Sequence, residues 1–190
     1  MSYELRSARW LAHGIMEEVI RPGDRIVDAT AGNGHDTLFL AQLTGETGHV
    51  TAFDIQADAI ERSRLLLREN GVEDRVTLIC DGHQHMDEYV KEPVRAVMFN
   101  LGWLPGGDKS VTTLWETTRT AILKALELLE PMGVCTVCVY PGHEEGTHEK
   151  NELVNLLSSL RPQDFNILRQ TFINAGPGSP ECFVIQKQAK

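Results

Sequence analysis

The sequence predicts an α/β protein whose doubly wound, mostly parallel sheet is covered by helices on both faces. Short apolar runs with a strand pattern alternate with amphipathic helical runs along most of the chain. The last two strand-like runs, 165–174 and 181–188, are joined only by the turn-rich "AGPGSP". They therefore predict an antiparallel hairpin at one edge of the sheet.

Each element is expected from its hydrophobic period and from the Gly and Pro residues that bound it. The first helix is predicted over 3–20, because apolar residues recur with a helical period as far as Val19 and Pro22-Gly23 follows. Further helices are expected at 35–43, 56–70, about 84–90, about 112–130 and about 145–160. Strands are expected at 25–30, 49–55, 75–80, 94–100 and 134–140, with "EPMG" as a turn before the last of these.

Length and composition indicate one domain, 1–190, with a single core. The chain has 190 residues, of which 42% are hydrophobic and 24% charged, as is ordinary for globular proteins. The N-terminal segment carries charges throughout and contains no continuous apolar run, so neither a signal peptide nor a membrane span is expected. We therefore expect a cytoplasmic protein.

The cysteines and histidines do not predict a disulfide framework or a metal site. The four cysteines lie in apolar surroundings and fit a reducing compartment. Cys135 and Cys138 form a CxxC string inside a predicted strand, where residues three apart point to opposite faces. His83 and His85 have no Cys or further His close by in sequence, so no bound metal is expected.

A glycine-rich turn after the first predicted strand is the strongest sign of a ligand site. That strand runs into "DATAGNG", in which Gly32 and Gly34 permit a tight turn and close approach of a ligand to the backbone. Asp54 follows Gly34 by twenty residues and ends the second strand, where an acid can accept both hydroxyls of an adenosyl ribose. The carboxyl ends of these strands are therefore expected to bind an adenosyl ligand.

The residues behind the turn favour S-adenosylmethionine (SAM) over a dinucleotide. A dinucleotide site prefers a third glycine where Thr37 stands, and holds its pyrophosphate at the helix N-terminus. Asp36 lies in the first helical turn, where it stabilises the helix dipole but would repel a pyrophosphate. A sulfonium with a zwitterionic amino-acid tail tolerates that acid better.

Other residues at the same strand ends complete the expected cofactor site. Asp81 ends the third strand, where it can reach the adenine amino group, cap the following helix, or do both. His83 is expected to line the pocket. The predicted cofactor-binding residues are Thr30, Gly32, Asn33, Gly34, Asp36, Asp54, Gln56, Asp81, His83 and Asn100.

Three strings of this sequence together resemble a known family. "DATAGNGHDTLFLA", "FNLGWLPGGDKSVTT" and "VYPGHEEG" are similar to those of the MnmM/YtqB-type tRNA methyltransferases, formerly labelled putative rRNA methylases, among the class I SAM-dependent methyltransferases. The resemblance extends over essentially the whole chain. It implies a Rossmann-like class I methyltransferase fold. It also implies methylation of 5-aminomethyl-2-thiouridine at the tRNA wobble position to the 5-methylaminomethyl form, with the anticodon stem-loop as partner.

Methylation of an aliphatic amine requires hydrogen-bond acceptors near the nitrogen, because an ammonium has no lone pair to attack with. Asn100 ends the fourth strand, and its side-chain oxygen, with the carbonyls of Leu101 or Gly102, can accept these bonds. The neutral imidazole of His143 can take the proton, although a contact with a neighbouring glutamate at the helix start is the alternative. The predicted catalytic residues are Asn100, Gly102 and His143.

Substrate contacts are expected from the loop after the fourth strand and from the fifth strand. Trp103 can stack on a base or pack under its own loop, and Gly107 with Lys109 can receive a phosphate or form a connector. Tyr140 is expected to shape the acceptor pocket. A small-molecule methyltransferase, an rRNA methyltransferase and an adenosyl-binding module without catalysis remain alternatives.

The charge of the chain limits how it can bind RNA. The formal net charge of −9 argues against broad, nonspecific binding of nucleic acid, so any RNA contact must be local. Candidate cations are Arg6, Arg9, Lys109 and Arg119. A homodimer would pool two weak basic patches, so a dimer is also expected.

Overall fold

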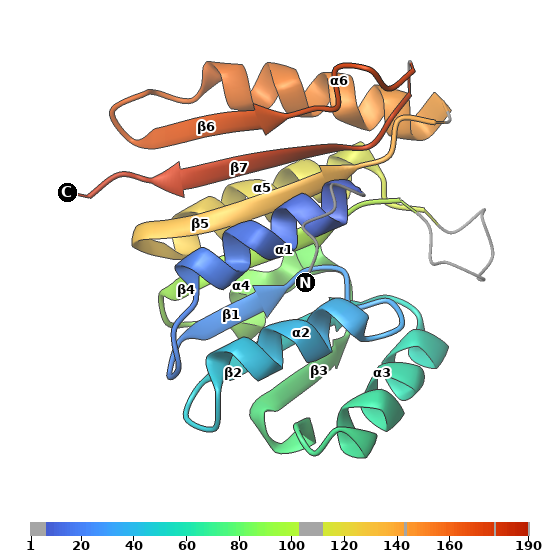
Figure 1. The fold of residues 1–190 in the computed structure, drawn as a ribbon, viewed down its shortest axis with the longest axis vertical. Helices are drawn as coiled ribbons and strands as arrows, with labels where there is room; N and C mark the ends of the chain where they lie inside the picture. Colours follow the sequence, from blue (N-terminus) through green and yellow to red (C-terminus); the bar gives the residue numbers. More distant parts are fainter. Residues whose placement is uncertain (1–6, 103–111, 143, 177, 190) are drawn as a thin grey trace.

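The fold is built on one seven-stranded sheet in the order β3-β2-β1-β4-β5-β7-β6 (Figure 1). The computed structural model describes residues 7–102, 112–142, 144–176 and 178–189. β1 to β5 run parallel to one another, whereas β7 runs antiparallel to both β5 and β6. The strands are β1 Arg25–Asp28, β2 His49–Asp54, β3 Val76–Cys80, β4 Val94–Asn100, β5 Leu129–Val139, β6 Phe165–Gln170 and β7 Glu181–Lys187.

Helices cover both faces of this sheet because alternate strand residues point to opposite sides. Ile26 of β1 packs in the core beneath α1, α2 and α3, whereas its neighbour Val27 packs beneath α4, α5 and α6. Figure 1 shows α1 and α2 on the near side of the sheet and α5 on the far side. The helices are α1 Ala8–Val19, α2 His35–Thr44, α3 Ala57–Glu69, α4 Met86–Tyr89, α5 Trp115–Leu128 and α6 Glu144–Ser159, with short 3-10 turns at Glu73–Arg75 and His83–His85.

The predicted fold class is confirmed, including the C-terminal hairpin. The strand order reverses between β1 and β4, as a doubly wound sheet requires. β6 and β7 form the antiparallel hairpin, and β6 is the edge strand. In the part of the chain that the structure describes, no helix combines the length and apolar character needed to cross a membrane.

The two cysteines of the CxxC string point to opposite faces, as predicted. Cys135 lies in the core under α5 and α6, and Cys138 lies in the core under α1 and α2. Cys138 pairs in register with Cys182 of β7, and both are free, buried thiols. Burial raises the pKa of the Cys135 thiol well above its usual value, so this side chain packs as an apolar group.

The segment "EPMG" differs from its prediction as a turn before the fifth strand. It lies within β5, where the register with β4 shifts: Val94 pairs with Leu129, but Ala96 pairs with Val134. Met132 adopts a positive φ of 65°, and the extra residues bulge out of the ladder. Other boundaries also differ, since α1 begins at Ala8 after the N-cap Ser7, α5 begins at Trp115 and β6 ends at Gln170.

The turn between β1 and α2 approaches α3 so closely that a side chain would not fit at Gly34. Gly34 has a φ of 82°, and an added Cβ would lie 2.8 Å from the Cα of Ser63. Gly71 has a similar φ of 67° but has nothing within 4 Å of an added Cβ. Substitutions at Gly34 and Gly71 can therefore separate the free-energy cost of a positive φ from the cost of the close contact with Ser63.

We therefore predict that Gly34→Ala destabilises the protein more than Gly71→Ala does. Gly71→Ala should lower the free energy of unfolding by about 1 kcal/mol, from the backbone conformation alone. Gly34→Ala should cost roughly 1–3 kcal/mol more, because the backbone of α3 must move. Urea unfolding of the two variants measures the difference, and equal losses would contradict the close packing of the turn on α3.

Candidate active site

A cavity of about 580 Å³ opens at the carboxyl ends of β1, β2, β3 and β4, where the strand order reverses. Its volume lies within the range of roughly 300–1,000 Å³ that is usual for small-molecule sites. The position is the one predicted for an adenosyl ligand. The predicted cofactor residues that line it are Thr30, Gly32, Asn33, Asp36, Asp54, Gln56, Asp81, His83 and Asn100, and Gly34 lies in the adjoining turn.

Asp54 is held rigidly at the end of β2 by two backbone amides. Its Oδ2 accepts the N–H of Gly32 at 2.9 Å, and its Oδ1 accepts the N–H of Gln56 at 2.9 Å. Gly32 is in turn fixed from α3, because its carbonyl accepts the hydroxyl of Ser63. Each carboxylate oxygen keeps a further lone pair. Asp54 can therefore accept two ligand hydroxyls without moving.

Asp81 lines the cavity just after β3, the strand beside β2, and is tied to the short helical turn that follows it. Its carboxylate accepts from the Gly82 amide at 2.7 Å, from His85 at 3.0 Å and from the Tyr89 hydroxyl at 3.0 Å. The His85 hydrogen bond is the main reason why the pKa of Asp81 lies below its usual value, with help from Gly82 and Tyr89. The residue before the turn is Gly82, so Asp81 is not its N-cap.

His83 is a buried, neutral histidine in the wall of the cavity. Its Nδ1 lies 3.0 Å from the carbonyl oxygen of Ala29, and its ring packs edge-on against Phe99. Burial lowers the pKa of His83 below its usual value. Because a carbonyl only accepts, Nδ1 carries the proton and Nε2 is an acceptor.

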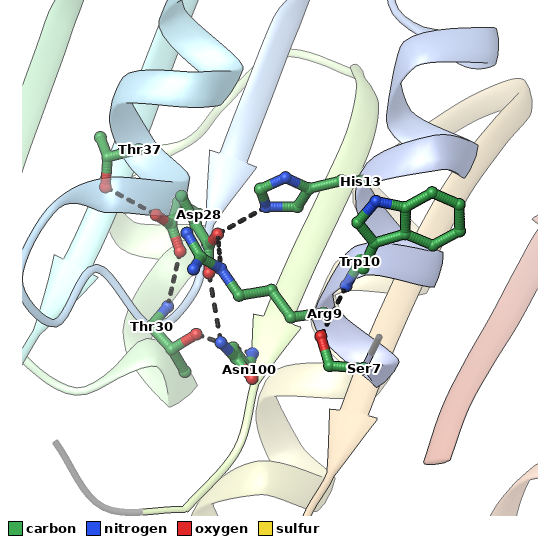
Figure 2. Close-up of polar contacts among 9 residues, drawn as sticks. Ser7, Arg9, Trp10, His13, Asp28, Thr30, Thr37 and Asn100 are labelled. Atoms are coloured by element: carbon green, nitrogen blue, oxygen red, sulfur yellow. Dashed lines mark hydrogen bonds and ion pairs between the residues drawn. The ribbon is translucent and has the colours of Figure 1, made fainter. Parts of the chain in front are cut away.

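Asp36 connects α1 to the carboxyl end of β4 (Figure 2). Its Oδ1 accepts from Arg9 Nε at 2.5 Å and from His13 Nε2 at 2.7 Å, and its Oδ2 accepts from Asn100 Nδ2 at 3.2 Å. Burial alone would raise the pKa of Asp36, but the hydrogen bond from His13 and the charge and hydrogen bond of Arg9 outweigh it and lower the pKa. Asp36 is thus an ionised carboxylate with 7% of its surface exposed.

Asn100 is fixed at two points and has one polar atom without a partner. Its backbone N–H donates to the hydroxyl of Thr30 at 2.8 Å, and its side-chain Nδ2 donates to Asp36. The remaining atom, Oδ1, is buried and has no hydrogen-bond partner among the residues that the structure describes. A buried acceptor that no protein group satisfies is costly unless a ligand supplies the donor.

Tyr140 lines the same cavity after β5. Burial, followed by the charges of Cys138 and Asp36, raises the pKa of its hydroxyl above the usual value. The hydroxyl therefore stays protonated at neutral pH. It can donate a hydrogen bond but does not act as an anionic base.

Gly102 also lines the cavity, and both of its backbone groups are bonded to Thr113. Its N–H donates to Thr113 Oγ1 at 2.9 Å, and its carbonyl accepts the Thr113 N–H at 3.1 Å. Thr113 and Thr118 then donate their hydroxyls to Glu149, which is buried on α6. Burial raises the pKa of Glu149. These bonds join Gly102, just before residues 103–111, to Thr113, just after them, and connect both to α6.

Five residues named from the sequence lie outside the described residues: Arg6, Trp103, Gly107, Lys109 and His143. Arg9 and His13 were not predicted to belong to the cofactor site, and no role was predicted for Asp28, Thr113 and Glu149. One signal was available for the first pair. Arg9 and His13 are four residues apart on α1, and so lie on one side of a helix whose other side is apolar. Residues in the described part of the chain form no group of three or more metal-ligating side chains.

The fold is that of a class I methyltransferase. A crystal structure described as a putative rRNA methylase from Clostridium thermocellum is 44% identical to this chain, with a TM-score of 0.95 over 97% of this chain and 100% of the other. A putative methyltransferase from Streptococcus mutans, solved in complex with SAH, is 37% identical, with a TM-score of 0.88 over 97% and 99% of the two chains.

Residues 50–186 match the family described as "Putative rRNA methylase", and the chain belongs to this family. A curated relative from Arabidopsis thaliana, named tRNA (mnm(5)s(2)U34)-methyltransferase, chloroplastic, is 41% identical over 167 residues. That alignment covers 83% of this chain and 61% of the plant protein. The chain thus spans about three fifths of the length of this relative.

Asp28 is a fully buried acid at the end of β1, beneath the cavity. Its carboxylate accepts the Thr37 hydroxyl at 2.6 Å and the Thr30 N–H at 3.1 Å. Burial, and then the charge of Asp36, raises its pKa from 3.8 to about 7 against the effect of these hydrogen bonds. The folded protein therefore holds a proton here over a pH range in which the unfolded chain has lost it.

We predict that the free energy of unfolding of Asp28→Asn increases relative to that of the wild type as the pH rises. Between about pH 4 and pH 7 the folded wild type binds more protons than its unfolded chain, so its free energy of unfolding falls with rising pH. Asparagine does not ionise, so Asp28→Asn does not show this fall in the free energy of unfolding. In the wild type the fall amounts to at most about 4 kcal/mol. Urea unfolding of both proteins at pH 5 and pH 8 measures the change, and a difference independent of pH would contradict the raised pKa.

Proposed function

We propose that this protein transfers a methyl group from SAM to the amine of 5-aminomethyl-2-thiouridine at the tRNA wobble position, giving 5-methylaminomethyl-2-thiouridine. The substrate is suggested by the name of the Arabidopsis relative, and the cofactor by the SAH in the Streptococcus mutans neighbour. The observation that carries the chemistry is the buried Oδ1 of Asn100, an acceptor without a partner in the wall of the cavity.

The residues of the cavity fit SAM. Asp54 keeps free lone pairs for two ribose hydroxyls, and the backbone of Gly32 and Asn33 borders the space beside it. Ile55, which is 62% exposed, gives the wall apolar surface for a base. The carboxylates of Asp54 and Asp81 favour a cationic ligand over a pyrophosphate, whereas the charge of Asp36 is already paired with Arg9. The other predicted cofactor contacts, from Thr30, Gly34, Gln56 and His83, belong to the same proposal.

When bound, SAM supplies a sulfonium methyl group that an uncharged amine can attack in line. Asn100 Oδ1 can accept an N–H from the amine of the substrate. An amine bound in this way has its lone pair pointing away from Oδ1, where it can face the methyl group of SAM. Tyr140 contributes a hydroxyl that stays protonated and can only assist by hydrogen bonding. The Gly102 carbonyl already accepts one bond, from Thr113, and has a second lone pair for the amine.

Roles for the predicted residues outside the described part of the chain complete the proposal. His143 takes the proton of the amine, Trp103 stacks on the wobble base, and Gly107 with Lys109 receives a phosphate. These roles rest on residue chemistry and on the family resemblance of the strings that contain them.

We further propose that the protein works in the cytoplasm as a homodimer. The four cysteines are free thiols, which suits a reducing compartment. The edge strand β6 exposes Ile167 and Leu168, and Ile173, just beyond it, is 99% exposed. An edge with this apolar character supports pairing with a second copy. A second copy also doubles the few cations available to an acidic chain that must contact an anticodon stem-loop.

Deletion of the gene tests the proposed substrate. Nucleosides from digested tRNA and rRNA of the deletion strain are compared by mass spectrometry with those of the parent. We expect the 5-methylaminomethyl nucleoside to disappear from tRNA and its aminomethyl precursor to accumulate, with return on complementation. Unchanged tRNA with a methyl group missing from rRNA would instead favour the activity that the family description names.

Two substitutions should separate cofactor binding from turnover. Asp54→Ala should weaken SAM binding about 10- to 100-fold in calorimetry, because hydrogen bonds to a carboxylate are lost. Asp58→Ala removes an exposed acid of α3 that does not line the cavity and serves as the control. Asn100→Ala should instead lower kcat about 10- to 100-fold with nearly unchanged SAM affinity. Undiminished SAM affinity in Asp54→Ala, or undiminished turnover in Asn100→Ala, would contradict the assignment concerned.

A further inference from the structure

We propose that Asp36, held by Arg9 and His13 of α1, is the positioning residue that sets which end of the Asn100 amide faces the methyl acceptor. The proposal rests on the proposed function, since it concerns the same amine-directed site. It gives Asp36 a role in turnover rather than the cofactor contact or helix-dipole role expected from the sequence.

The two oxygens of Asp36 have different partners. Oδ1 accepts both bonds from α1, from Arg9 at 2.5 Å and from His13 at 2.7 Å. Oδ2 accepts the bond from Asn100 Nδ2 at 3.2 Å. With only 7% of Asp36 exposed, water cannot readily take the place of any of these donors. The carboxylate is thereby oriented with one oxygen toward Asn100.

An amide needs such a partner because its two ends have nearly the same shape. The oxygen and nitrogen of an asparagine side chain are distinguished mainly by what they bond to. An ionised carboxylate only accepts, so Nδ2 must face Asp36, and the reversed amide would place two oxygens together. Asn100 Oδ1 is consequently kept free as an acceptor. The pKa of Asp36, lowered by His13 and Arg9, keeps the carboxylate ionised for this purpose.

The first helix is fixed well enough to impose this orientation. The Ser7 hydroxyl caps it by accepting the Trp10 N–H at 3.2 Å, one residue from Arg9 (Figure 2). The His13 ring stacks on Phe39 of α2 with centroids 3.8 Å apart and planes at 4°. Phe39 and Asp36 belong to the same helix, so α1 and α2 are joined by a ring stack and by two charge-assisted bonds.

A double-mutant cycle between Asp36→Asn and Asn100→Ala tests the proposal. At position 36 an asparagine of the same shape would turn its oxygen to Arg9 and His13 and its NH₂ to Asn100, which would favour the reversed Asn100 amide. We expect Asp36→Asn to lower kcat for tRNA carrying 5-aminomethyl-2-thiouridine about 10- to 100-fold. The SAM dissociation constant should change less than about threefold, and in the Asn100→Ala background Asp36→Asn should cause no further loss of kcat.

A matched control and a milder variant complete the experiment. Glu181 is also a buried carboxylate held by an arginine, Arg169, at 2.6 Å, and does not line the cavity. Glu181→Gln should lower the melting temperature but leave kcat unchanged. If Asp36→Asn does not fold, His13→Phe retains a ring on Phe39 and removes one bond to Asp36. It should lower kcat about three- to tenfold in the wild type, and not at all in the Asn100→Ala background.

The outcomes separate this inference from the proposed function. Two results would overturn the positioning role of Asp36 without contradicting the proposed reaction. One is that the kcat losses of Asp36→Asn and Asn100→Ala multiply in the double mutant. The other is that Asp36→Asn weakens SAM binding but does not change kcat. An Asn100→Ala variant with normal turnover would instead remove Asn100 from the proposed reaction. Failure of the nucleoside comparison concerns only the identity of the substrate.

Discussion

The carboxylate of Asp36 is the contact on which the site depends, because it joins elements that are distant in sequence. It accepts two donors from α1 and one from the end of β4, and it belongs to α2. A buried charge that loses a partner is strongly destabilising. Three features therefore depend on one another: the packing of α1 on the sheet, the ionisation of Asp36 and the orientation of the Asn100 amide.

The same constraint explains the character of the cavity. Three carboxylates and one arginine border it, so it favours a cationic ligand. Beneath it, Asp28 is kept partly protonated at neutral pH by burial and by the charge of Asp36. On the acceptor side, Thr113 accepts the Gly102 N–H and donates its hydroxyl to Glu149, which ties the residues after β4 to α6. The cofactor side and the methyl-acceptor side of the cavity are thus formed with different helices, at the carboxyl ends of the same strands.

Local patterns in the sequence were enough to predict the fold and the strand-end residues. Gly32 lies in the turn after β1 and Asp54 ends the neighbouring parallel strand β2, so their contact follows from the topology. The partners of Asp36 and Glu149 could not be predicted, because they depend on how α1 and α6 pack rather than on any local period. The bulge at "EPMG" was missed for a related reason: Pro and Gly usually mark a turn, and only the pairing of β4 with β5 keeps the segment in the sheet.

A crystal structure of the protein with SAH and an anticodon stem-loop carrying 5-aminomethyl-2-thiouridine would show which atom of Asn100 meets the amine. We expect the amine nitrogen to lie within hydrogen-bond distance of Asn100 Oδ1, about 2.7–3.2 Å, while Nδ2 still faces Asp36. An amine bound away from Asn100, or an Asn100 amide that meets it through Nδ2, would show that Asp36 and Asn100 do not direct the methyl acceptor.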